Sequence, residues 1–201
     1  GLASGFQPTG PAYTLMFVMM FMLMSVRDIV LERQAGTLTR LRLGAASSAV
    51  LATGLFLGPL LVGLAQAAIL LGFNALLPGM DFGDSPATLV LLMVLFTGVS
   101  SALALVAATF CRTSGQADGL GMSVSMLMAS LGGLWWPLEI VPGFMRQIGT
   151  MLPSGRGIVV FHNMIGRGWG LQENAPHLIW LAGTLVVLLL VARLRLRRLI
   201  D

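Results

Sequence analysis

Long runs of apolar residues without a charge dominate this sequence, and they limit the possible folds more than any other feature. A helix needs about 20 predominantly apolar residues, at about 1.5 Å each, to cross a hydrocarbon core about 30 Å thick. The candidate spans are residues 12–26, 49–77, 87–110, 120–136 and 178–191. The sequence therefore predicts one all-α domain over residues 1–201, a polytopic membrane helical bundle with about five transmembrane helices.

Composition excludes several other classes of protein. Hydrophobic residues make up 56% of the 201 residues and charged residues 10%, whereas about 25% charged is usual for soluble domains. So few charges cannot cover a soluble monomer with a polar surface, and this hydrophobicity excludes intrinsic disorder. All 12 basic residues are Arg, so the chain has no Walker A lysine for ATP phosphates. We also expect no nucleic-acid partner, because the arginines form no patch on a polar face.

The arginines predict how the helices are oriented, because positive charge is retained on the cytoplasmic side of a membrane. With the C-terminus inside, five alternating spans place nine arginines in the cytoplasm, namely Arg27, Arg33, Arg40, Arg42, Arg112, Arg193, Arg195, Arg197 and Arg198. Arg146, Arg156 and Arg167 then lie outside. The same orientation places Gly1 outside without a signal peptide of the usual type. We therefore expect an earlier segment with at least one further span.

Charge is concentrated between the first two spans, in residues 28–43. A helix over this segment has one apolar and one polar face, as in an amphipathic helix at a membrane surface. The apolar face carries Leu31, Ala35 and Leu38, and the polar face carries Arg33, Thr37 and Arg40. We interpret the segment as a docking helix for a cytoplasmic protein. The alternative is a helix that rests on lipid without a partner.

Residues 135–157 are apolar but cannot form one continuous span, because three prolines interrupt them. These are Pro137, Pro142 and Pro153. Irregular backbone within a membrane needs cover from protein or from a water-filled cavity. We expect short re-entrant or interfacial helices on the outer side, with Trp135 and Trp136 at the level of the lipid headgroups. An amphipathic outer loop that rests on lipid is the alternative.

The predicted spans contain no charged residue away from their ends. Carriers that couple transport to ions normally bury such groups. The pattern therefore favours energy delivered from outside the bilayer, and a lipid-like or amphipathic, drug-like substrate. The candidate residues for lining its pathway are Gln66, Asn74, Ser100 and Ser123. Their alternative role is hydrogen bonding between helices.

Three separated motifs resemble the membrane subunit of ABC-2-type exporters, a bacterial ABC permease family. Glu32 to Leu38 is similar to the family's Glu-Arg-x-x-Gly-Thr-Leu segment after its second span, and residues 110–117 are similar to the short cytoplasmic turn before its fifth. The outer Pro-x-Glu-x-x-Pro and later Pro of the family are matched by Pro137, Glu139, Pro142 and Pro153. The resemblance covers spans two to six of six, which implies that the first span and an outer segment are missing.

The resemblance implies a permease subunit of the bacterial inner membrane, with a cytoplasmic C-terminus and with no catalytic, cofactor or metal site of its own. Two permease subunits, identical or different, pair in the lipid bilayer above two ATP-binding cassette subunits that hold ATP and Mg. The residues that couple to the ATPase subunit are Glu32, Arg33, Gly36, Thr37, Leu38 and Arg40. The outer gate or re-entrant residues are Trp135, Trp136, Pro137, Glu139, Pro142 and Pro153.

Two other classes of protein stay open at this point. A membrane-embedded enzyme acting on lipids would need a polar cluster at the bilayer surface, and only one set of outer residues supplies a nucleus for it. This set is Glu139, Arg146, Arg156 and His162. A non-transporting membrane scaffold is the third class, and it would not stimulate a partner ATPase.

Overall fold

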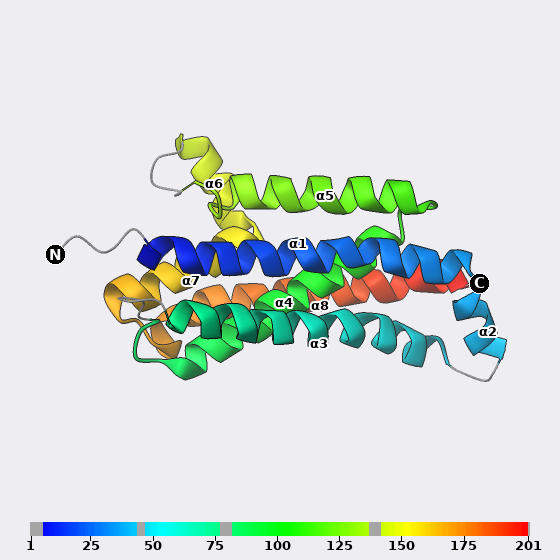
Figure 1. The fold of residues 1–201 in the computed structure, drawn as a ribbon, viewed down its shortest axis with the longest axis horizontal. Helices are drawn as coiled ribbons and strands as arrows, with labels where there is room; N and C mark the ends of the chain where they lie inside the picture. Colours follow the sequence, from blue (N-terminus) through cyan, green and yellow to red (C-terminus); the bar gives the residue numbers. More distant parts are fainter. Residues whose placement is uncertain (1–5, 44–46, 77–81, 137–141, 201) are drawn as a thin grey trace.

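The computed structural model describes residues 6–43, 47–76, 82–136 and 142–200, which form an elongated bundle of helices (Figure 1). The helices are α1 Phe6–Gln34, α2 Thr37–Leu43, α3 Ser48–Ala75, α4 Pro86–Ala108, α5 Ser114–Leu131, α6 Gly143–Met151, α7 Pro153–Arg167 and α8 Leu171–Ile200. The predicted all-α polytopic bundle is confirmed for this part of the chain.

In the described part of the chain, four helices, rather than the expected five, are long and apolar enough to cross a membrane. They are Gly10–Gln34 of α1, Ala49–Ala75 of α3, Pro86–Ala108 of α4 and Leu171–Leu196 of α8. The expected span over residues 120–136 is the exception, because its helix α5 has 18 residues and begins among polar ones, including Gln116 and Asp118. It ends at Leu131, where Gly132 and Gly133 follow, and Gly133 has a φ of 81° that side chains disfavour.

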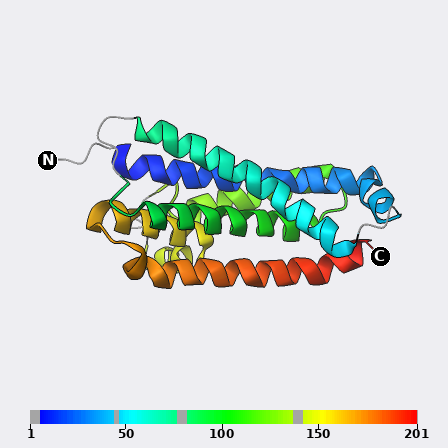
Figure 2. The same ribbon diagram turned by 90° about the horizontal axis from the view of Figure 1, so that it is seen from below.

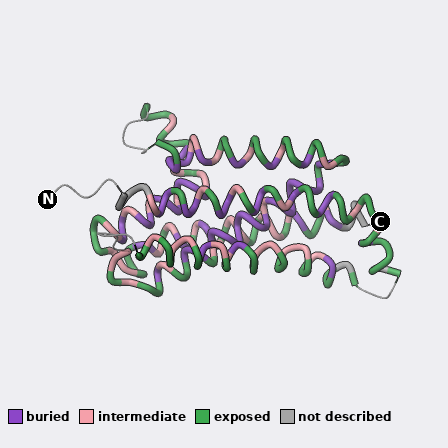
Figure 3. Tube along the Cα trace, in the orientation of Figure 1, coloured by how far each residue is buried: buried purple, intermediate pink, exposed green. Residues whose placement is uncertain are grey.

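Two of the long helices form the centre of the bundle. Buried residues make up 67% of the apolar window of α4 and 50% of that of α1, against 11% for α3 and 17% for α8. The buried side chains of Leu15 and Met22 on α1 and Phe96 on α4 belong to one core. Helix α3 crosses one side of this pair and α5 lies along the other, with their outer faces exposed (Figures 2 and 3). Such apolar exposed faces suit a lipid surrounding.

The helices bring most of the arginines to one end of the bundle. The end of α1, α2, the turn between α4 and α5 and the end of α8 lie together at that end, on the right of Figure 1. The three arginines that remain, Arg146, Arg156 and Arg167, belong to α6 and α7 at the other end. The bundle thus separates the two arginine groups along its long axis, as the sequence pattern predicts.

The single helix expected over residues 28–43 is divided in the structure. Helix α1 continues past its apolar part to Gln34, and the short α2 starts at Thr37. Gly36 between them has a φ of 69°, in the left-handed region that glycine adopts without a steric penalty. The prediction missed this break because the apolar periodicity continues across Gly36.

The proline-rich segment contains separate short helices, as expected, although Pro137 and Glu139 lie outside the described residues. Helix α6 begins after Pro142, and α7 begins at Pro153, whose fixed φ suits a first helical position. Helix α7 continues to Arg167, beyond the expected end of the segment at residue 157. The broken backbone follows from the prolines, while its depth in a membrane stays a prediction.

Candidate functional site

The end of α1 is joined to the turn between α4 and α5 by side chains that bond to backbone carbonyls. Arg33 donates a hydrogen bond to the carbonyl of Cys111. Gln34 donates from its Nε2 to the carbonyl oxygen of Arg112, at 2.9 Å. The backbone N–H of Arg112 in turn donates to Oε1 of Gln116, also at 2.9 Å. Two segments that are far apart in the sequence therefore form one polar junction.

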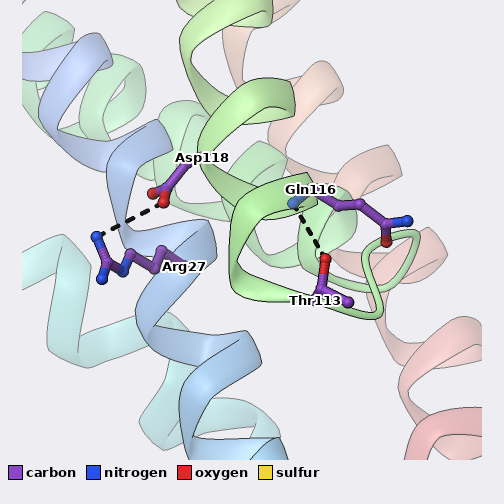
Figure 4. Close-up of polar contacts among 4 residues, drawn as sticks. All are labelled: Arg27, Thr113, Gln116 and Asp118. Atoms are coloured by element: carbon purple, nitrogen blue, oxygen red, sulfur yellow. Dashed lines mark hydrogen bonds and ion pairs between the residues drawn. The ribbon is translucent and has the colours of Figure 1, made fainter.

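Helix α5 is attached to the same junction at its first turns. Arg27 on α1 and Asp118 on α5 form an ion pair with 3.5 Å between Nη1 and Oδ2 (Figure 4). Thr113 caps the helix, because its Oγ1 accepts a hydrogen bond of 3.3 Å from the N–H of Gln116 (Figure 4). The ion pair is half exposed, at 53% and 51%, so we expect it to contribute no more than about 1 kcal/mol. It orients α5 more than it stabilises the fold.

Helix α8 holds the other side of this turn. Nε of Arg195 donates to Oγ1 of Thr109 at 3.0 Å, and its guanidinium lies 3.8 Å from the centre of the Phe110 ring. A guanidinium over an aromatic face is an attractive arrangement. The turn over residues 109–113 is therefore held by α1 and by α8 at the same time.

Cys111 lies inside this junction and is 3% exposed. Burial raises the pKa of its thiol, because removal from water disfavours the charged thiolate, and the positive charge of Arg33 opposes the shift in part. A thiol in such surroundings is poorly reactive. Its role in the structure is to pack and to present its carbonyl to Arg33.

The predicted coupling residues fall into two groups. Glu32, Thr37 and Arg40 are exposed, so their side chains are available to a partner. Arg33 and Leu38 contribute to packing instead, because Arg33 is half-buried and bonded and Leu38 is buried. Gly36 supplies the break between α1 and α2. The exposed side chains of Glu32, Thr37 and Arg40 therefore form an exposed edge beside the junction.

The candidate pathway residues on α3 bond to α1. Asn74 donates from Nδ2 to Oγ1 of Thr14 at 3.0 Å. Gln66 donates from Nε2 to the carbonyl of Phe17 at 3.4 Å, while its Oε1 is buried without a hydrogen-bond partner. Both contacts are of the interhelical kind that the sequence left as an alternative.

The remaining pathway candidates do not join them. Ser100 on α4 is buried and donates to the carbonyl of Phe96 in its own helix, at 2.9 Å. Ser123 lies on the exposed face of α5. The four candidates therefore lie on three different helices and do not form one cluster. Thr97 on α4 is a further buried polar residue, and its Oγ1 has no hydrogen-bond partner.

The four outer gate candidates that the structure describes lie at the opposite end of the bundle from the junction (Figure 1). Trp135 and Trp136 follow α5 and are 44% and 59% exposed. Pro142 is exposed and Pro153 is buried. These four residues therefore do not contact the coupling residues.

Sequence reasoning missed several residues of the junction. In the sequence, Arg27 and Arg195 served only to orient the spans, Cys111 was covered only as part of the motif at residues 110–117, and Asp118 was not singled out. Each bonds to a residue far along the chain, so no local spacing indicates the contact. The available signal was that two of the three recognised motifs end at the same side of the predicted membrane.

Comparison with known proteins decides the family. The family model described as ABC-2 family transporter protein matches residues 3–194. The chain belongs to the ABC-2 family. Among curated relatives of this ABC-2 chain is the linearmycin resistance permease protein LnrN of Bacillus subtilis (strain 168), which is 30% identical over 142 residues. That stretch is 71% of this chain and 37% of the relative, so the chain spans less than half of that protein's length. No solved structure matches the chain.

Membership of the ABC-2 family confirms the resemblance that the three motifs indicated. With four apolar helices long enough to cross a bilayer, this ABC-2 chain is a multi-pass membrane protein. The family consists of transporter permeases, which favours transport over the lipid-modifying enzyme and the scaffold. In this setting the junction is where two of the family-like motifs meet, and Glu32 lies at its exposed edge.

Proposed function

We propose that this chain is the membrane part of an ATP-driven exporter that moves a lipid-like or amphipathic molecule outward across the bacterial inner membrane. The observation that carries the proposal is the division of charge along the bundle. The charged side chains of the four candidate spans lie toward the helix ends, and those at the end of α1 include Glu32 at an exposed edge beside the junction. Energy for transport must then reach the spans through that edge.

The family normally works with an ATP-binding subunit, and we propose that this subunit holds ATP and Mg. We infer that this subunit contacts the exposed edge formed by Glu32, Thr37 and Arg40, with the C-terminus on the cytoplasmic side. Movement of α1 would reach the turn at residues 109–113 through Arg33 and Gln34. From that turn it would pass directly into α5. A second permease subunit, identical or different, would complete the path through the bilayer.

The nature of the substrate is supported by the lack of charge in the spans and by the relative that is named a linearmycin resistance permease. A pathway lined by apolar side chains favours molecules with a large apolar part. The buried oxygens of Gln66 on α3 and Thr97 on α4, which lack partners among the described residues, are the polar groups that such a molecule would meet. Outward transport fits the name of that relative, which is a resistance permease.

The test uses the full-length protein with its ATP-binding subunit in vesicles. Glu32→Lys reverses an exposed charge at the proposed docking edge, and Asp84→Lys reverses an exposed charge at the other end of the bundle. We expect Glu32→Lys to abolish ATP-driven transport of linearmycin or of a fluorescent short-chain phospholipid, because charge-assisted contacts across an interface are geometrically specific. Asp84→Lys should transport normally.

Two results would contradict the proposal. Transport that continues without the ATP-binding subunit would show that energy does not arrive through the exposed edge. Equal coupling of transport to ATP hydrolysis in Glu32→Lys and in the unmodified protein would show that the docking surface lies elsewhere. Membrane insertion of both variants, measured by protease protection, keeps either result interpretable.

A further inference from the structure

Arg156 lies in the first turns of α7, at the end of the bundle opposite the junction. Its Nη1 is 3.0 Å from Nδ1 of His177, and its guanidinium lies 5.4 Å from the centre of the Trp180 ring. Both partners are on α8. Two helices that pack against each other therefore hold a cation between an imidazole and an indole.

The charge of Arg156 is not balanced by these partners. A guanidinium is permanently charged and can only donate hydrogen bonds. Nδ1 of His177 must therefore accept, so this imidazole is neutral in the arrangement. An imidazole and an aromatic face are both neutral, and among the described residues no carboxylate forms an ion pair with Arg156. The ion pair of the described part, between Arg27 and Asp118, lies at the other end.

Arg156 also has a donor, Nε, without an acceptor among the described residues. Its Nε is buried and has no hydrogen-bond partner, and the hydrogen bond that the structure shows for its guanidinium leaves from Nη1. Buried donors are almost always satisfied in folded proteins. The side chain is only half-buried, so part of it stays accessible from outside.

Helices α7 and α8, which carry Arg156 and its partners, are also joined by two buried asparagines. Asn163 and Asn174 are 4% and 0% exposed and share a hydrogen bond of 3.1 Å. Asn174 also donates to the carbonyls of Trp169 and Gly170, at 3.2 and 2.9 Å. These bonds join the two helices, so the contact of Arg156 with His177 and Trp180 on α8 is part of the fold.

We propose that Arg156, His177 and Trp180 form a binding site for the anionic head group of an amphiphile. A phosphate or carboxylate would accept hydrogen bonds from the unused N–H groups of Arg156, since guanidinium groups pair with phosphates and carboxylates through parallel charge-assisted hydrogen bonds. Trp180 offers an apolar face with a polar edge, which suits the boundary between headgroups and hydrocarbon. The placement of this site on the outer side rests on the proposed function, whereas the binding itself does not.

The experiment measures binding to the full-length protein purified in dodecyl maltoside, a detergent with an uncharged head group. The probes are dodecyl phosphate, dodecanol as its uncharged analogue, and inorganic phosphate. We expect saturable binding of dodecyl phosphate, followed by tryptophan fluorescence, and at least tenfold weaker binding of the other two. Arg156→Gln should weaken the binding of dodecyl phosphate at least tenfold. Equal binding by Arg156→Gln and the unmodified protein would overturn the site.

Arg167→Gln is the matched control, because Arg167 lies on the same helix, bonds to a neutral Asn163 and stacks on Trp169. It should bind dodecyl phosphate within twofold of the unmodified protein, and an equal loss in both variants would overturn the assignment to Arg156. Arg156→Lys tests whether a loss of binding comes from misfolding, since lysine keeps the positive charge but not the planar guanidinium group. It should retain binding that is weakened by about three- to tenfold, and full loss in a folded Arg156→Lys protein would also count against the site.

Two sources share the proposed head-group chemistry, a membrane phospholipid and a transported amphiphile. Retention of phosphatidylglycerol by the unmodified protein but not by Arg156→Gln, after exchange into phosphatidylcholine vesicles, would assign the site to a lipid. Loss of ATP-driven dodecyl phosphate movement in Arg156→Gln, with equal lipid retention, would assign it to the substrate. Either result supports the site. If Arg156→Gln and the unmodified protein behave alike in both the lipid-retention and the transport experiment, the site is overturned. The binding arm needs neither ATP nor a partner, so its failure is distinct from failure of the proposed function.

Discussion

The guanidinium of Arg33, in the last turn of α1, donates a hydrogen bond to the backbone carbonyl of Cys111, 78 residues later in the turn between α4 and α5. Its neighbour Glu32 is exposed. Adjacent residues of one motif therefore have different roles, since Arg33 joins two parts of the bundle and Glu32 is free to face a partner. Substitutions at the two positions should separate stability from coupling.

Arg33→Gln should destabilise the protein by about 1–2 kcal/mol, because a hydrogen bond from a charged group to a half-buried carbonyl is lost or weakened. Thermal unfolding of the full-length protein in detergent measures this. Arg40→Gln is the control, because Arg40 is exposed and its replacement should stay within about 0.5 kcal/mol. Equal unfolding midpoints for the two variants would contradict the role of Arg33 in the junction.

Cys111 should react slowly with a maleimide at neutral pH. The raised pKa of its thiol means that the folded state favours the protonated form. This contribution to stability is present below the unfolded pKa and is lost as the pH rises through the folded pKa. Because alkylation needs the thiolate, we expect a rate about tenfold or more below that of the denatured protein, and a rise of the rate at alkaline pH. A rate at neutral pH equal to that of denatured protein would refute the buried position.

Gly121 and Gly119 on α5 provide a matched pair. A Cβ on Gly121 would collide with the carbonyl oxygen of Leu23 on α1, whereas one on Gly119 would meet nothing within 4 Å. Gly121→Ala should cost about 1–3 kcal/mol through overpacking. Gly119→Ala should be neutral or stabilise by up to about 1 kcal/mol, because Ala favours helices. Unfolding measurements that rank the two in the opposite order would argue against the close packing of α5 on α1.

Asn74 and Gln66 should differ in their effect on stability. Asn74→Leu removes the hydrogen bond to Thr14, and such bonds between membrane helices contribute about 0.6 kcal/mol, with a maximum near 1.7. Gln66→Leu removes a buried oxygen without a partner together with a long hydrogen bond of 3.4 Å to Phe17, so the two effects offset and the change should be neutral or stabilising. If Gln66 faces the substrate, its replacement changes the transport rate at unchanged stability. A destabilised Gln66→Leu protein would show that the side chain serves packing instead.

Gly36 tests the break between α1 and α2. Its φ of 69° is strained for most side chains, by about 1–2 kcal/mol, whereas Asn tolerates it. Gly36→Val should therefore reduce the stimulation of the partner ATPase, and Gly36→Asn should preserve it. The space around this glycine is open, so both side chains fit. Equal ATPase stimulation by the two variants would show that coupling does not depend on this backbone bend.

The ends of some helices were predictable because residues that favour helix starts or ends lie next to them in the sequence. The span expected over 87–110 corresponds to Pro86–Ala108, where Ser85 and Pro86 mark the start and Cys111 with Arg112 follow the end. The span expected over 12–26 was too short, because hydropathy marks only the apolar part of a helix. The helix continues through Arg27 to Gln34, where charged side chains are in any case outside a bilayer core.

The exposed part of the candidate site was also predictable, since a charged motif between two spans must lie outside the hydrocarbon. The junction was not predictable, because its contacts join residues that are far apart in the chain. Arg33 with Cys111 and Arg195 with Thr109 are 78 and 86 positions apart. Periodicity describes one helix at a time and contains no information about such pairs.

The sequence by itself determined that this is an all-helical membrane protein, because uncharged apolar runs of this length can satisfy their backbone in lipid only as helices. It also determined the family, through motifs in a set order. Tertiary structure alone decided that α1 and α4 form the core, that Arg33 serves the fold while Glu32 stays exposed, and that Arg156 meets His177 and Trp180 and no carboxylate among the described residues. These features depend on which helix faces meet, and that depends on packing between segments distant in the chain.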